Sequence, residues 1–108
     1  MSVQVPIDQL PDVAGGFGES AYVLAGDGDG APRVTHARIA FVGGVIETSV
    51  GRRAAAALGA NPDACVLWPA PAAGEMSLIV DVVARGPVPA EGGVVRFDPI
   101  GAVRHRPA

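Results

Sequence analysis

Apolar and polar residues alternate along much of the chain, a pattern that predicts short β-strands joined by glycine-rich turns. Between the first two apolar runs lies the segment 26–30, Gly-Asp-Gly-Asp-Gly, whose residues tolerate the backbone angles of a turn. The Gly43-Gly44 pair marks the tightest predicted hairpin. The predicted strands occupy residues 20–25, 33–42, 45–48, 64–68, 77–85 and 94–97, with an optional last strand over 102–105.

Two segments break the alternation and predict helices. Residues 50–59 are rich in alanine, the best helix former, with Ser49 expected as the N-cap and Gly59 and Pro62 marking the end. The apolar side of this helix is expected to carry Ala54, Ala57 and Leu58. Near the amino terminus, apolar residues at spacings of three predict a second, short helix: Ile7, Leu10 and Val13. Short strands with one or two short helices favour a mostly β fold, a small antiparallel barrel, over a doubly wound sheet.

Composition narrows the class of protein. With 108 residues and 49% hydrophobic content, the chain is expected to form one domain over residues 1–108 with its own core. Cys65 is the only cysteine, which predicts a reducing, cytoplasmic location without an internal disulfide. A net charge of -3 argues against nucleic-acid binding, and charged, glycine or proline residues interrupt every candidate membrane span. The spacing of His, Cys, Asp and Glu predicts no metal site.

The start of the predicted central helix is the strongest candidate for chemistry. Unpaired N–H groups at a helix amino terminus bind phosphate, and here the hydroxyls of Thr48 and Ser49 and the guanidinium groups of Arg52 and Arg53 lie beside them. Two arginines in a first turn oppose the helix dipole, so a functional reason for them is expected. The segment therefore predicts a phosphate site, with a solvated, salt-bridged helix end as the alternative.

The strand over 33–42 supplies a second group of candidates. Alternation places His36 and Arg38 on one face of the strand together with Val34 and Ala40. This face is interpreted either as a cofactor contact or as an exposed or dimer-interface surface. By contrast, Cys65 lies within an apolar strand and is interpreted as a small buried hydrophobe without chemistry.

The central segment also resembles a known family. A strand ending in Thr-Ser, a short loop, an arginine, a leucine five residues later and Asn-Pro before an apolar strand are features of the phosphate-binding segment of pyridoxamine 5'-phosphate oxidase-like proteins. The matching residues are Thr48, Ser49, Arg53, Leu58, Asn61 and Pro62. The likeness extends more loosely over residues 21–87. It implies a split β-barrel homodimer with FMN or the deazaflavin F420 in a groove between subunits, held by Thr48, Ser49, Arg52, Arg53, His36 and Arg38.

The resemblance implies an oxidoreductase of unspecified substrate, and two departures qualify it. Ala54 stands where family members that bind flavin strongly carry a lysine. The chain ends at Arg104-His-Arg-Pro-Ala108, without the longer segment with which the true oxidases hold the vitamin, so oxidation of pyridoxamine phosphate is not expected. The alternative is a non-catalytic split-barrel protein that has lost tight flavin binding and holds haem, another ligand or none.

Overall fold

The computed structural model describes residues 2–26, 28 and 30–107, and it is mostly antiparallel β. Residues 27 and 29 of the turn predicted over 26–30 lie outside the described residues. The elements in chain order are β1 (Ser2–Gln4), the 3-10 helix η1 (Ile7–Gln9), α1 (Leu10–Gly15), β2 (Ser20–Ala25), β3 (Arg33–Arg38), β4 (Ala40–Val42), β5 (Val45–Val50), α2 (Arg52–Ala60), β6 (Asp63–Trp68), β7 (Ser77–Arg85) and β8 (Gly93–His105).

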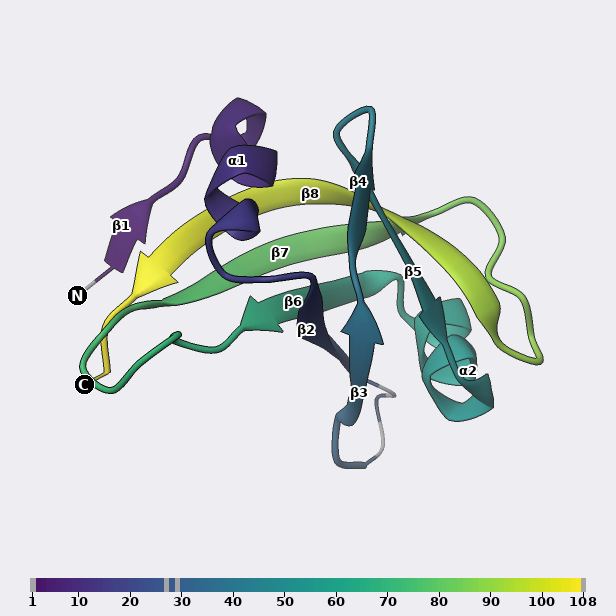
Figure 1. Cartoon of the computed structure of the whole chain (residues 1–108). Coiled ribbons are helices and arrows are strands. Elements are labelled where there is room, and N and C mark those ends of the chain that lie inside the picture. Colours follow the sequence, from purple (N-terminus) through teal and green to yellow (C-terminus); the bar gives the residue numbers. More distant parts are fainter. Residues whose placement is uncertain (1, 27, 29, 108) are drawn as a thin grey trace.

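One curled sheet contains all the strands. Its order is β3-β2-β6-β7-β8-β5-β4, and β1 pairs with the end of β8. The curl brings β5 back toward β3, where the Thr48 hydroxyl donates a hydrogen bond to the Arg38 carbonyl at 2.6 Å (Figure 1). The predicted small antiparallel barrel with two short helices is therefore confirmed, and the barrel is split where β3 and β5 diverge.

The prediction of a single strand over residues 33–42 is wrong, because the chain bends at Ile39. The first half, β3, pairs with β2, whereas the second half, β4, pairs with β5. The Ile39 N–H donates to the Glu19 carbonyl at 2.8 Å and fixes the bend. One continuous alternating segment thus forms the two edge strands of the sheet. The alternation of side chains does not predict where this segment divides into two strands.

The carboxy-terminal part of the sheet also differs from expectation. The two strands predicted over 94–97 and 102–105 are one strand, β8, which continues through Pro99 and pairs with β7 across a register shift at Asp81/Val82. Strand β1 was not predicted, because three exposed residues carry too little pattern. It adds to the end of β8, where the Ser2 Oγ and the His105 Nδ1 lie 3.1 Å apart.

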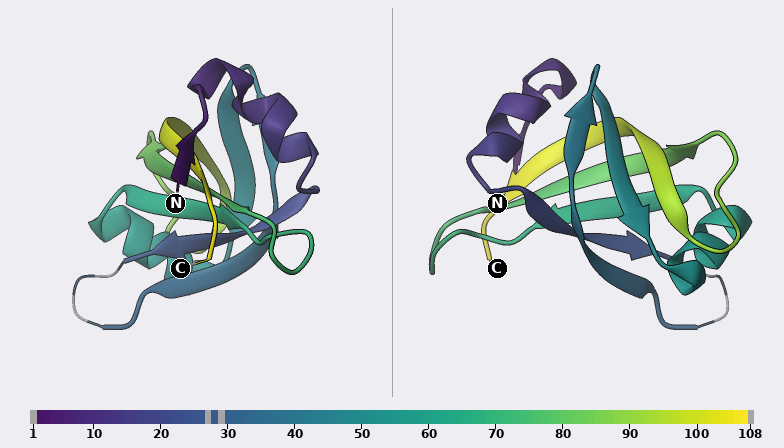
Figure 2. Two further views of the ribbon diagram at one scale, coloured as in Figure 1. Left: turned by 90° about the vertical axis from the view of Figure 1, so that its left-hand side faces the viewer. Right: turned by 45° about the vertical axis from the view of Figure 1, so that its right-hand side comes forward.

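The core lies inside the curl of the sheet, and the two helices close its ends. Trp68 and Phe97 are the largest buried side chains, and the Trp68 indole N–H donates to the Gly18 carbonyl at 3.2 Å. Helices α1 and α2 lie at opposite ends of the molecule (Figure 2). Helix α1 buries Leu10 and Ala14, whereas α2 buries the predicted apolar side together with one further alanine: Ala54, Ala55, Ala57 and Leu58.

Gly92 allows the loop before β8 to lie directly against the start of α2. Its φ is +90°, and a Cβ placed there would lie 2.7 Å from the Val50 carbonyl oxygen and 2.9 Å from the Gly51 carbonyl carbon. Real Cβ atoms do not approach backbone this closely, so both the backbone angle and the space require glycine. Gly92 therefore helps to fix the position at which α2 begins.

We expect Gly92→Ala to lower the free energy of unfolding by more than the roughly 1–2 kcal/mol that a left-handed backbone costs an alanine. Gly86→Ala is the matched control, because Gly86 has a φ of +71° and no atom within 4 Å of an added Cβ. Urea unfolding of both variants measures the difference. Equal losses of stability would show that the close approach to Val50 and Gly51 relaxes without cost.

Candidate functional site

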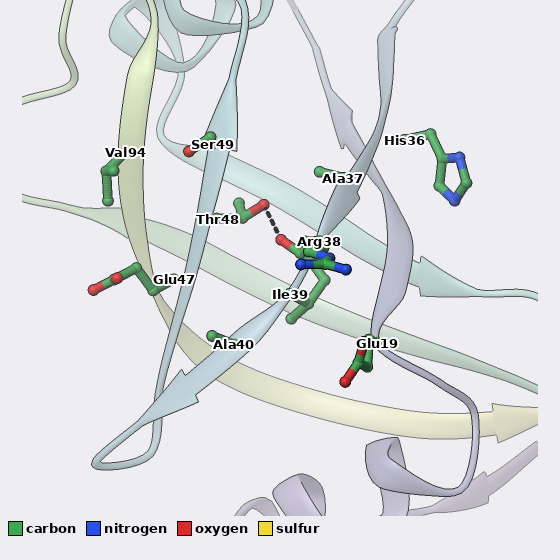
Figure 3. A pocket seen from close by; sticks show the side chains of 10 residues that line it. All are labelled: Glu19, His36, Ala37, Arg38, Ile39, Ala40, Glu47, Thr48, Ser49 and Val94. Carbon is green, nitrogen blue, oxygen red and sulfur yellow. Dashed lines mark hydrogen bonds between the residues drawn. The ribbon is translucent and has the colours of Figure 1, made fainter.

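A groove runs along β3 and consists of two adjoining pockets that share His36. The first, of about 420 Å³, lies between residues 36–40 and residues 47–49, with Glu19 and Val94 at its edges (Figure 3). The second, of about 710 Å³, lies between residues 32–36 and the start of α2 at 51–54. Volumes of this order accommodate a cofactor-sized ligand. We call the two pockets together the β3 groove.

Arginine side chains gather at the α2 end of the β3 groove. Arg52 and Arg53 occupy the first turn of α2, are exposed, and line the second pocket with Arg33 of β3. Arg33 and Arg53 also line a smaller hollow beside it. The first hydrogen bond of the helix runs from the Ala55 N–H to the Gly51 carbonyl at 2.9 Å, so the preceding N–H groups have no partner within the helix. Guanidinium and N–H donors therefore converge on one end of the groove.

Ser49 does not cap α2, and this prediction is wrong. The N-cap is Gly51, in extended conformation, and no side chain makes a capping hydrogen bond. Ser49 instead lies in β5, because pairing with Val94 of β8 extends that strand to Val50. Its side chain is exposed and lines the first pocket rather than the helix end.

Thr48, Arg38 and His36 occupy the strands on either side of the groove. Thr48 is buried, and its hydroxyl holds β5 against β3 through the bond to the Arg38 carbonyl. His36 and Arg38 are both exposed, so the predicted alternation along β3 is confirmed. Figure 3 shows the His36 ring pointing away from Thr48 and Ser49. It stacks on Tyr22 of β2, with the ring centroids 4.6 Å apart.

Three charged residues of the groove were not singled out from the sequence. Arg33 lines the same pocket as the α2 arginines only because the sheet curls, and Glu19 precedes β2 at the rim of the first pocket. Glu47 of β5 accepts a hydrogen bond from the Arg96 Nε at 3.0 Å across the pair of strands β5 and β8. Only the register of these strands reveals the Glu47–Arg96 ion pair. Arg96 thereby compensates the charge of Glu47, one of the two acidic residues of the groove.

Cys65 lies on β6, outside the groove, and is half-buried. Burial raises the pKa of its thiol. The negative charge of Asp81, which pairs with Cys65 from the neighbouring strand β7, raises this pKa further. The described residues contain no group of three His, Cys, Asp or Glu side chains that could hold a metal ion. None of the helices in the described part of the chain has the length and apolar character of a membrane span.

Solved structures share this curled sheet. A candidate pyridoxamine 5'-phosphate oxidase of Listeria innocua aligns with a TM-score of 0.70 at 15% identity, over 91% of this chain and 96% of its own. An F420 reductase aligns with a TM-score of 0.61 at 15% identity, over 77% of this chain and 87% of its own. The haem storage protein HutZ of Vibrio cholerae aligns with a TM-score of 0.66 at 16% identity, over 89% of this chain and 94% of its own. No family model and no curated protein sequence matches the chain.

These similarities establish the fold. The chain is a split β-barrel of the kind found in pyridoxamine 5'-phosphate oxidase-like structures, as its sequence resemblance implied. Proteins with different ligands in their names share this fold, so function must be argued from the β3 groove and its side chains.

We expect Cys65 to react with iodoacetamide only at higher pH than an ordinary cysteine. The thiolate is the nucleophile, and the raised pKa of Cys65 means that the thiolate forms only at higher pH. The measurement is the pH profile of alkylation in the folded protein, with the urea-unfolded chain as the reference. Asp81→Asn should move the profile of the folded protein toward lower pH. Coincident profiles for folded and unfolded chains would contradict the shift.

Proposed function

We propose that the β3 groove binds FMN or the deazaflavin F420 and that the protein is an oxidoreductase of the pyridoxamine 5'-phosphate oxidase-like family, acting on a small molecule. The observation that carries this proposal is the convergence of Arg33, Arg52 and Arg53 with the amino terminus of α2 at one end of the groove. A phosphomonoester carries a charge of about -1.5 to -2 and accepts several hydrogen bonds. The donors at this end suit such a group.

The other end of the groove suits a flat ring system. Small side chains, Ala37 and Ala40, lie along its wall, with the Ile39 side chain between them (Figure 3). Arg38 and Ser49 offer polar groups at its edges. When bound, the flavin would supply the electron transfer, and the chain would provide position, charge and exclusion of water. In this proposal Arg53 and Arg52 hold the phosphate while Ser49, Arg38 and His36 border the rest of the cofactor.

Ala54 is compatible with this proposal. It is 5% exposed and packs into the core, so its side chain belongs to the buried side of α2. Arg33 approaches the same end of the groove from β3 and adds a cation there. In our proposal Arg33 and Arg52 take the place of the lysine that family members with strong flavin binding carry.

The groove favours a phosphate-bearing cofactor over haem. His36 is the histidine that borders the groove, and its ring stacks on Tyr22 and points away from Thr48 and Ser49 (Figure 3). That position does not offer an iron ligand to the first pocket. FMN and F420 both carry phosphate, and their different absorbance spectra distinguish them. We also propose that the protein works as a homodimer, because the groove is open along its length.

The first test is the absorbance spectrum of the purified protein after incubation with FMN, and separately with F420, followed by desalting. Retention of either cofactor near one equivalent per chain supports the proposal. Loss of both would favour a split barrel without a flavin cofactor. Turnover is then sought with the retained cofactor and candidate electron donors and acceptors.

We expect Arg53→Ala to weaken FMN binding about 10- to 100-fold, because a hydrogen bond between charged groups contributes about 1.5–3 kcal/mol. Riboflavin lacks the phosphate, so its affinity should hardly change in the same variant. Flavin fluorescence titrations measure both affinities. Arg85→Ala is the matched control, because Arg85 is an exposed arginine paired with Asp98 on β8 and lies outside the groove. An equal loss for riboflavin and FMN would show that Arg53 does not contact the phosphate.

A further inference from the structure

A further hollow adjoins the β3 groove at its α2 end. Its volume is about 420 Å³, which falls in the range of small-molecule pockets. Arg33 and Arg53 line both this hollow and the second pocket of the groove, so the two spaces share a boundary. The other lining residues are alanines of α2: Ala56, Ala57 and Ala60. We call this space the side hollow.

The sequence of α2 explains why the side hollow is open. Residues three, four and seven positions after Arg53 lie on the same side of the helix as Arg53. All three are alanines, so no long side chain of α2 fills the space beside that arginine. Strand β3 lies next to α2, and Arg33 at its first position borders the hollow from the opposite side. The side hollow is therefore a space with small side chains on its helix wall and an arginine on each element.

The charges around the side hollow favour an anion. Helix α2 contains no acidic residue, so Arg53 has no partner three or four positions further along the helix. Within the described part of the chain, Arg52 and Arg53 make no ion pair, whereas Arg85 and Arg96, which are also exposed, each pair with a carboxylate. The lining of the hollow includes no described acidic side chain. An anionic group is thus the ligand that this lining suits.

A single phosphate at the α2 end of the groove does not account for the side hollow. FMN ends at its phosphate, so FMN held by Arg52, Arg53 and the helix amino terminus would leave the hollow empty. A ligand whose chain continues past that phosphate would enter the hollow, because Arg53 borders both spaces. The alanine wall offers no side-chain hydrogen bond to a neutral polar group, whereas guanidinium groups bind carboxylate and phosphate well.

We propose that the side hollow is a second anion subsite, which binds a carboxylate or phosphate group that follows the phosphate held at the end of the β3 groove. This inference rests on the proposed function and deepens it, because it favours a cofactor with further negative charge beyond its first phosphate over FMN. Two cofactors have this chemistry. F420 carries carboxylates on a chain beyond its phosphate, and FAD carries a second phosphate.

The test compares matched ligands that differ only beyond the first phosphate, by fluorescence titration of the full chain. The pairs are FAD with FMN, and F420 with the deazaflavin monophosphate that ends at its phosphate. We expect the longer member of at least one pair to bind about tenfold more tightly, because it adds a hydrogen-bonded pair of charged groups. A gain for FAD assigns a phosphate to the side hollow, and a gain for F420 assigns a carboxylate. Equal affinities within both pairs would overturn the proposal.

Charge variants at Ala60 locate the second anion. Ala60 is exposed at the end of α2 and lines the side hollow. Ala60→Glu should weaken the longer ligand about 5- to 10-fold and Ala60→Arg should strengthen it, whereas FMN should change by less than about twofold, because a charge acts most on the nearest anion. The gain in Ala60→Arg cannot arise from unfolding.

Two control variants separate charge at the side hollow from size and from net charge. Ala60→Gln has the size of Ala60→Glu without its charge. Ala73→Glu adds the same charge in the exposed loop between β6 and β7, at the opposite end of the molecule from α2 (Figure 1). Neither control should change the affinity of the longer ligand by more than about twofold. Equal effects of Ala60→Glu and Ala60→Gln would show that the second anion does not lie in the side hollow.

A probe without flavin separates this inference from the proposed function. If the protein binds no flavin and no deazaflavin, the proposed function fails, and inorganic tripolyphosphate then replaces the cofactors. We expect tripolyphosphate to bind about tenfold more tightly than inorganic phosphate, to shift the amide NMR signals of Ala56 and Ala60, and to bind more weakly to Ala60→Glu. Equal affinities for the two anions, or amide shifts elsewhere only, would overturn the subsite in that case.

Discussion

The bend at Ile39 is the constraint on which the rest of the molecule depends. On one side of it, β3 pairs with β2 at one end of the sheet, and on the other side, β4 pairs with β5 at the opposite end. The Ile39 N–H bonds to the Glu19 carbonyl, and the Thr48 hydroxyl bonds to the Arg38 carbonyl. The bend and these two hydrogen bonds therefore close the curled sheet, without a continuous hydrogen-bonded ladder between β3 and β5.

The β3 groove follows from that manner of closure. Because β3 and β5 meet near Ile39 and diverge toward α2, the space between them opens at the strands and widens at the helix. Gly92 allows the loop before β8 to pack on the Val50 and Gly51 backbone, so the first turn of α2 is held at the wide end. The arginines of that turn face Arg33 across the opening, which concentrates positive charge where the donors of the helix are free.

The filled interior explains why the candidate ligand site lies on the outside of the barrel. Trp68, Phe97 and Ile46 fill the inward positions of the strands, as expected of a small barrel. The candidate site that remains is the β3 groove at the split of the barrel.

The sequence by itself determined the mostly β class, most strand positions, the buried side of α2 and the shared face of His36 and Arg38, because local alternation or helix propensity predicts each of them. It also drew attention to Arg52 and Arg53, because two cations in a first helical turn contradict a local preference. Only the tertiary structure decided the break at Ile39, the union of two expected strands into β8, and the replacement of Ser49 by Gly51 as the N-cap of α2. Those outcomes depend on pairing between strands far apart in the chain, as does the approach of Arg33 to Arg53. Long-range register carries no signal in a single sequence, since the energy that selects it arises only when the strands meet.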